Sequence, residues 1–65
     1  MVPLKITIVG AGKIGIALAA TLAGAPEFSV EVIDRSEDAL DQLRAMRIDV
    51  SSRLYRHPDE LNTML

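Results

Sequence analysis

The spacing of hydrophobic and polar positions alternates between a strand period and a helix period along this chain. Residues 4–9 form a short run that is rich in β-branched side chains. Leu4, Ile6 and Ile8 fall on one face, and the other face is mixed. This pattern predicts a mostly buried β-strand, with Pro3 suited to its first position.

A helical period follows over residues 13–23. Ile14, Leu18 and Leu22 fall at positions i, i+4 and i+8, and alanines fill much of the remaining circumference. A helix that is apolar nearly all round is expected to be buried on more than one side. Gly24 suits the position just after its end.

The same alternation is repeated in the second half of the chain. Residues 29–34 predict a second strand, and Ser36 is placed to cap a helix that runs to about Met46. A third strand is expected between residues 48 and 56. Pro58 fits the first turn of a third helix, inside which the chain ends.

Strand–helix–strand–helix–strand order predicts an α/β protein of the Rossmann-like βαβαβ type. Right-handed crossovers give a parallel sheet in the order 3-2-1, with the first two helices on the same face. We expect residues 1–65 to be the N-terminal part of a dinucleotide-binding domain, truncated in the third helix. The opposite face of the sheet is expected to be apolar, and to be covered by the remainder of the chain or by a partner subunit.

Composition narrows the function classes. The 65 residues include no cysteine and one histidine, which excludes a disulfide framework and the usual zinc sites. The net charge is −2 and aromatic residues make up 3% of the chain, so we expect no nucleic-acid partner and no membrane surface. The uncharged run from Ile14 to Pro26 is also too short to span a bilayer.

A secretory signal peptide is one alternative interpretation of the N-terminal region. Lys5 and Lys13 would form its basic region, residues 14–22 its apolar region, and residues 23–25 a small-residue cleavage site. The strand-like run at residues 4–9 lies where the basic region should be. We therefore favour a folded domain over a signal peptide.

The segment between the first strand and the first helix contains three glycines in the pattern Gly-x-Gly-x-x-Gly. Gly10 permits a tight turn, Gly12 leaves room for a pyrophosphate, and Gly15 allows close packing of helix on strand. The N–H groups at the start of the helix, near Lys13 and Ile14, are unpaired and favour an anion. The predicted site is therefore a phosphate-binding turn.

Asp34 ends the second strand, nineteen positions after Gly15. A carboxylate there accepts hydrogen bonds from the adenosine ribose and repels a 2′-phosphate, so NAD is the first cofactor predicted, with NADP as the second. Arg35 either reaches a 2′-phosphate or adenine, or is a solvated charge. Lys13 is either solvent-facing or a phosphate ligand. The predicted cofactor-binding residues are Gly10, Gly12, Lys13, Ile14, Gly15, Asp34 and Arg35, and no catalytic or metal-binding residue is assigned.

Residues 6–15, followed by Leu18, Leu22 and residues 30–36, resemble the N-terminal NAD(P)-binding domain of saccharopine dehydrogenase-like oxidoreductases. The resemblance extends from about Leu4 to Met46 and implies a cytoplasmic oxidoreductase whose substrate domain lies elsewhere. Potassium-channel regulatory domains of the RCK type share the glycine motif and the acidic strand end. The alternative function is therefore a nucleotide-sensing regulatory domain without catalysis, and whether the protein is an enzyme stays open.

Overall fold

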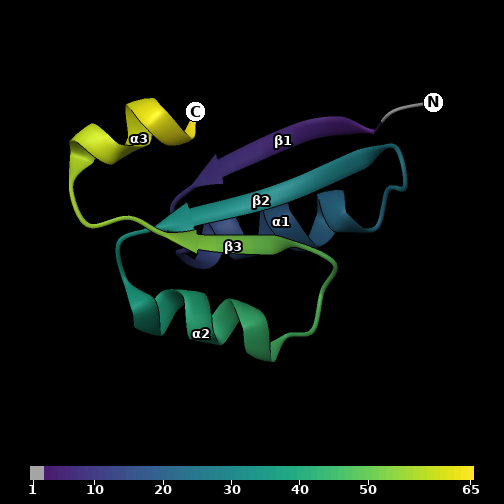
Figure 1. Ribbon diagram of the computed structural model, residues 1–65. Helices are drawn as coiled ribbons and strands as arrows, with labels where there is room; N and C mark the ends of the chain where they lie inside the picture. The colour runs from purple at the N-terminus through teal and green to yellow at the C-terminus, as the bar shows by residue number, and fades with distance from the viewer. Residues whose placement is uncertain (1–2) are drawn as a thin grey trace.

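The computed structural model describes residues 3–65 as a three-stranded parallel sheet with three helices (Figure 1). In chain order the elements are β1 (Leu4–Val9), α1 (Lys13–Ala23), β2 (Phe28–Asp34), α2 (Glu37–Ala45), β3 (Ser51–Leu54) and α3 (Pro58–Met64). The strand order is β1-β2-β3, with β2 in the centre. This confirms the predicted α/β class and the predicted strand order of a Rossmann-like half. The orders 3-2-1 and β1-β2-β3 describe the same sheet, counted from opposite edges.

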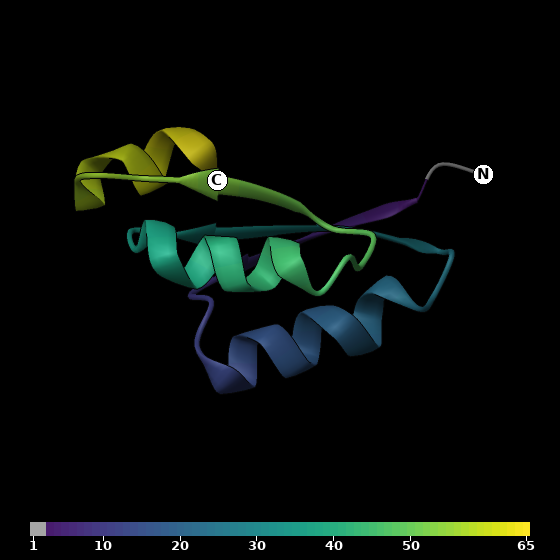
Figure 2. The same ribbon diagram turned by 90° about the horizontal axis from the view of Figure 1, so that it is seen from below.

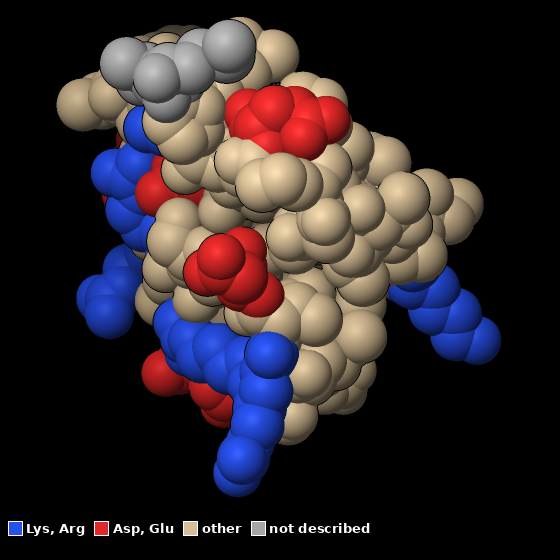
Figure 3. All heavy atoms as spheres, turned by 90° about the vertical axis from the view of Figure 1, so that its right-hand side faces the viewer, with Lys and Arg blue, Asp and Glu red and all other residues tan. Residues whose placement is uncertain are grey.

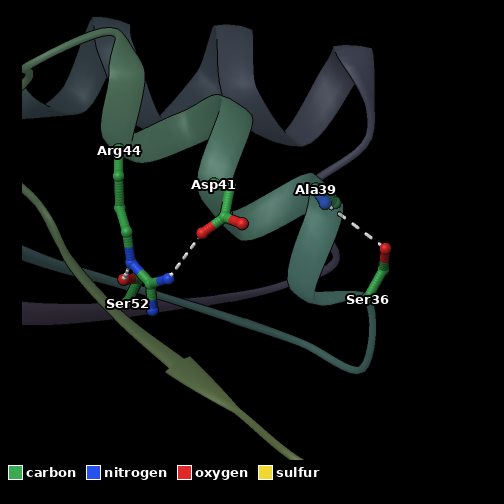
Figure 4. A network of polar contacts seen from close by, with 5 residues as sticks. All are labelled: Ser36, Ala39, Asp41, Arg44 and Ser52. Atoms are coloured by element: carbon green, nitrogen blue, oxygen red, sulfur yellow. Dashed lines mark hydrogen bonds and ion pairs between the residues drawn. The ribbon is translucent and has the colours of Figure 1, made fainter.

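Two helix starts lie where the sequence predicts them. The Ser36 hydroxyl caps α2 by accepting a hydrogen bond from the Ala39 N–H at 3.3 Å (Figure 4). Pro58 occupies the first turn of α3. Gly24 lies just after the end of α1, as predicted, in a right-handed conformation with φ −73°. Arg47, just after α2, is a non-glycine residue with a left-handed backbone conformation, at φ 55°.

A polar contact joins α2 to the neighbouring strand. Arg44 donates from Nε to the Ser52 hydroxyl on β3 at 2.9 Å, and from Nη1 to the Asp41 carboxylate at 3.1 Å. Figure 4 shows the Arg44 side chain reaching from α2 toward β3. Since these side chains are exposed, the contact orients α2 more than it stabilises the fold.

The elements form layers, with α1 and α2 on one side of the sheet and α3 on the other (Figure 2). The main core lies between the sheet and the first two helices, as the sequence predicts for those helices. Its buried members are Ala11, Ala19, Val30, Val32, Leu40 and Leu43. Central strand β2 therefore supplies the sheet side of this core.

Helix α1 is not buried on more than one side, contrary to what its apolar circumference predicts. Ile14 is 85% exposed and Leu18 is 48% exposed, whereas Ala19 is fully buried. The sheet-facing side combines Ala19 with Ile16 and Leu22, which pack partly buried against the core. The side of the molecule formed by α1 is accordingly broad and largely uncharged (Figure 3). Residues 14–22, the apolar region of the signal-peptide interpretation, lie within this helix.

The expectation of an apolar open sheet face is also wrong. Side chains alternate along a strand, so the face away from α1 and α2 carries Lys5, Thr7, Val9, Ser29, Glu31, Ile33, Ser51 and Arg53. Most of these are polar, and an ion pair joins Arg53 Nη2 to Glu31 Oε1 at 2.9 Å. Of the large apolar side chains that are exposed, Val9 lies on this face, and the others are Leu4, Ile14, Leu18, Met46 and Leu65.

No helix within residues 3–65 has the length and apolar character needed to cross a membrane.

Candidate functional site

The predicted glycine turn lies at the carboxyl end of β1, beside the carboxyl end of β2 (Figure 1). Gly10 has φ +112°, a backbone conformation that side-chain-bearing residues rarely adopt. Its N–H donates to the Ile33 carbonyl at 2.7 Å. The chain thus leaves β1 in a sharp turn that remains attached to β2.

Gly15 fixes the distance between α1 and this turn. A Cβ atom at Gly15 would overlap the carbonyl oxygen of Gly10, a backbone atom that has no freedom to swing away. The carbonyl carbon of Gly10 would follow at 3.1 Å, and a methyl group of Ile8 at 3.8 Å. The predicted role of Gly15, close packing of helix on strand, is therefore visible in the geometry.

Gly12 lies at the start of α1 and faces open space. Its carbonyl accepts the first helical hydrogen bond, from the Ile16 N–H at 2.8 Å, and no side chain caps the helix. A Cβ atom built on Gly12 would meet nothing within 4 Å. The first N–H groups of α1 have no partner inside the helix. This end of α1 therefore combines backbone donors with space for a ligand.

An open groove of about 570 Å³ runs over the same turn. Its lining residues are Ile8, Val9, Gly10, Gly12, Lys13, Ile14, Gly15 and Leu18. Lys13 and Ile14, both predicted site residues, are exposed at its rim. The groove brings together every predicted site residue of the glycine segment.

Asp34 lies on the β2 side of the turn and is half-buried. Its Oδ2 accepts a hydrogen bond from the Ala11 N–H at 2.5 Å, and its Oδ1 accepts one from the Ser36 N–H at 2.7 Å. Arg35 follows it and is exposed. Neither Asp34 nor Arg35 lines the groove, so the predicted site divides into a phosphate side and a ribose side that meet at Ala11.

Sequence reasoning did not single out Ala11, yet this residue connects the two sides. It is 3% exposed, and its backbone N–H makes the hydrogen bond to Asp34. The sequence feature that could have indicated its burial is its small size between two glycines, because a larger side chain would not fit in the core at this point. The spacing alone does not reveal the hydrogen bond.

The segment after β3 lies next to the ribose side. The Tyr55 N–H donates to the Asp34 carbonyl at 3.1 Å. His57 is the N-terminal cap of α3, and the Glu60 carboxylate accepts from its N–H at 3.3 Å. Within residues 3–65 no three His, Cys, Asp or Glu side chains gather as a metal site would require.

These residues fit a dinucleotide. Pyrophosphate requires backbone donors and an approach unblocked by side chains, and Gly12 with the start of α1 provides both. A ribose requires an acceptor fixed at the end of β2, and Asp34 is held there by two N–H groups. A bound nicotinamide cofactor would supply hydride chemistry that amino-acid side chains do not offer.

Comparison with known families gives one match. The family model described as the TrkA-N domain matches residues 6–63, which include both sides of the candidate site. The comparisons with curated proteins and with solved structures found no match.

Proposed function

The chain belongs to the TrkA-N domain family, and on this basis we propose that it binds NAD(H) with its pyrophosphate over Gly12 and its adenosine ribose at Asp34. TrkA-N domains are nucleotide-binding domains of the Rossmann type that bind NAD(H). The observation that carries the proposal is the open space above Gly12 at the uncapped start of α1. Phosphate oxygens there would accept from backbone N–H groups and lie at the positive end of the helix dipole.

The residues near Asp34 support NAD over NADP. The carboxylate is fixed by the N–H groups of Ala11 and Ser36, so it cannot move away from a ligand without breaking hydrogen bonds. A 2′-phosphate at this ribose would face that negative charge at short range. Arg35 acts in the opposite direction. Its exposed guanidinium, next to Asp34 in the sequence, would offset part of the repulsion between Asp34 and a 2′-phosphate.

The family occurs both in oxidoreductases and in regulators of potassium transport. We propose an oxidoreductase that resembles saccharopine dehydrogenase as the first role, in the cytoplasm. Its support is the resemblance over residues 4–46. The second candidate is a regulatory domain that senses the nucleotide, and the match to the TrkA-N family is equally compatible with it.

Titration of the chain with NAD, NADH, NADP and NADPH by calorimetry tests the proposal. We expect saturable binding of the first pair and weaker binding of the phosphorylated pair. Absence of binding by all four nucleotides would refute the cofactor assignment, and tighter binding of NADP would refute the role given to Asp34. An assay of nucleotide consumption then separates the two roles, because only an oxidoreductase consumes NADH in the presence of its substrate.

A further inference from the structure

We propose that Asp34 is a positioning residue for the phosphate-binding turn, in addition to the ribose acceptor assigned above. The inference rests on the proposed function, because the turn is taken to bind pyrophosphate. Its physical content is that one carboxylate holds the turn in its binding conformation before any nucleotide arrives. The adenosine and pyrophosphate halves of the site are then coupled through Asp34.

The geometry that points to this role is a contact between residues far apart in the sequence. Asp34 Oδ2 accepts from the Ala11 N–H at 2.5 Å across 23 positions, and the contact is partly buried. It lies directly beside the hydrogen bond from the Gly10 N–H to the Ile33 carbonyl. Two consecutive N–H groups of the turn are therefore fastened to two consecutive residues of β2.

This pair of hydrogen bonds decides where the next N–H groups point. Gly12 follows Ala11 directly and has no side chain to restrict its backbone. With Ala11 held from β2 and Gly15 held against Gly10, the intervening peptide groups are fixed at both ends. A donor array that is already ordered binds an anion without an added cost in conformational entropy.

The carboxylate is itself held in place. Asp34 Oδ1 accepts from the Ser36 N–H at 2.7 Å, so each oxygen has one donor from the chain. A carboxylate oxygen accepts more than one hydrogen bond, which leaves capacity for ribose hydroxyls. Positioning the turn and binding the ribose are thus compatible within one side chain.

The test uses an NAD analogue whose adenosine ribose lacks the 2′ and 3′ hydroxyls. If Asp34 acted only on the ribose, Asp34→Ala would not change the affinity for this analogue. We expect it to weaken binding of the analogue about tenfold, the effect of losing one hydrogen bond to a charged acceptor. Equal affinity of the wild type and Asp34→Ala for the analogue would overturn the proposal.

Glu31→Ala is the matched control. Glu31 is also an acidic residue of β2, but its carboxylate pairs with Arg53 on the opposite face of the sheet. We expect this variant to bind NAD and the analogue as the wild type does. A comparable loss in Glu31→Ala would attribute the effect to a general disturbance of β2, because removing a negative charge should not by itself weaken binding of an anion, and would contradict the positioning role.

Hydrogen exchange in the nucleotide-free chain provides a readout that does not depend on binding. Asp34→Ala is expected to speed exchange of the Ala11 N–H at least about tenfold, while Val32 in the centre of β2 keeps its rate. Faster exchange at both sites would indicate general destabilisation and would overturn the proposal, as would unchanged exchange at Ala11. If the wild type binds no nucleotide, the proposed function fails, but this measurement still decides whether Asp34 holds the turn.

Discussion

Gly15 and the carbonyl oxygen of Gly10 lie so close together that the space between them has no room for a methyl group. The relationship joins the first turn of α1 to the first residue of the glycine turn. Because one partner is backbone, the contact has no rotamer through which to relax. Gly15 therefore sets how closely α1 approaches the sheet.

Substitution Gly15→Ala should accordingly destabilise the fold. The added methyl group has to displace either α1 or the turn, and we expect a loss of about 3 kcal/mol or more in the free energy of unfolding. Urea denaturation followed by circular dichroism measures this loss. A variant as stable as the wild type would show that α1 moves without cost.

The substitution Gly12→Ala separates ligand approach from folding. A Cβ atom there meets nothing within 4 Å, so the free energy of unfolding should change by less than about 1 kcal/mol. The methyl group would nevertheless stand where the pyrophosphate is expected, and NAD affinity should fall at least about tenfold. Calorimetric titration checks this, and retained affinity would place the phosphates elsewhere.

Asp34→Ser should change cofactor preference. Removing the carboxylate removes the repulsion toward a 2′-phosphate and leaves Arg35 as the nearest charge in the sequence. We expect the ratio of NADP affinity to NAD affinity to rise about tenfold, measured by parallel titrations of both nucleotides. An unchanged ratio would mean that Asp34 does not face the ribose.

Two leucines on the helices test the observed burial. Leu40 on α2 is fully buried, whereas Leu18 on α1 is 48% exposed. Leu40→Ala should cost about 2–5 kcal/mol, and Leu18→Ala, its matched control, should cost less than about 1 kcal/mol. Equal losses in chemical denaturation would restore the sequence-based prediction that Leu18 is buried.

Ser36→Ala tests the N-terminal cap of α2. Loss of the hydroxyl that accepts from the Ala39 N–H should lower the free energy of unfolding by about 1 kcal/mol. Ser29→Ala, at an exposed position of β2, is the control and should have a smaller effect. If the two variants lose equal stability, the cap contributes nothing specific.

Features with local causes could be predicted from the sequence. Ser36 and Pro58 mark helix starts because their backbone and side-chain preferences act within a few residues. The alternation of apolar residues likewise predicts the strands, and the right-handed crossover rule then predicts their order in the sheet. The glycine spacing predicts where the turn lies because the turn needs a residue without a side chain at each of these positions.

Features that depend on tertiary packing could not be predicted in this way. In α1, apolar residues surround the helix, so periodicity alone does not distinguish the buried Ala19 from the exposed Ile14. The polar character of the open sheet face depends on which set of alternating residues α1 and α2 cover. The hydrogen bond between Asp34 and Ala11 depends on a side-chain rotamer and on the register of β1 with β2, neither of which the spacing specifies.

The central position of β2 has a consequence for how the domain opens. Strands β1 and β3 each pair with β2 and not with each other, and β3 is shorter, at 4 residues against 6, so β3 and α3 can detach while β1, α1 and β2 stay paired. Unfolding of β2 would instead remove the pairing partner of both other strands and so unfold the whole sheet. Partial unfolding should therefore begin at the C-terminal end, and the glycine turn belongs to the last cooperative unit to melt.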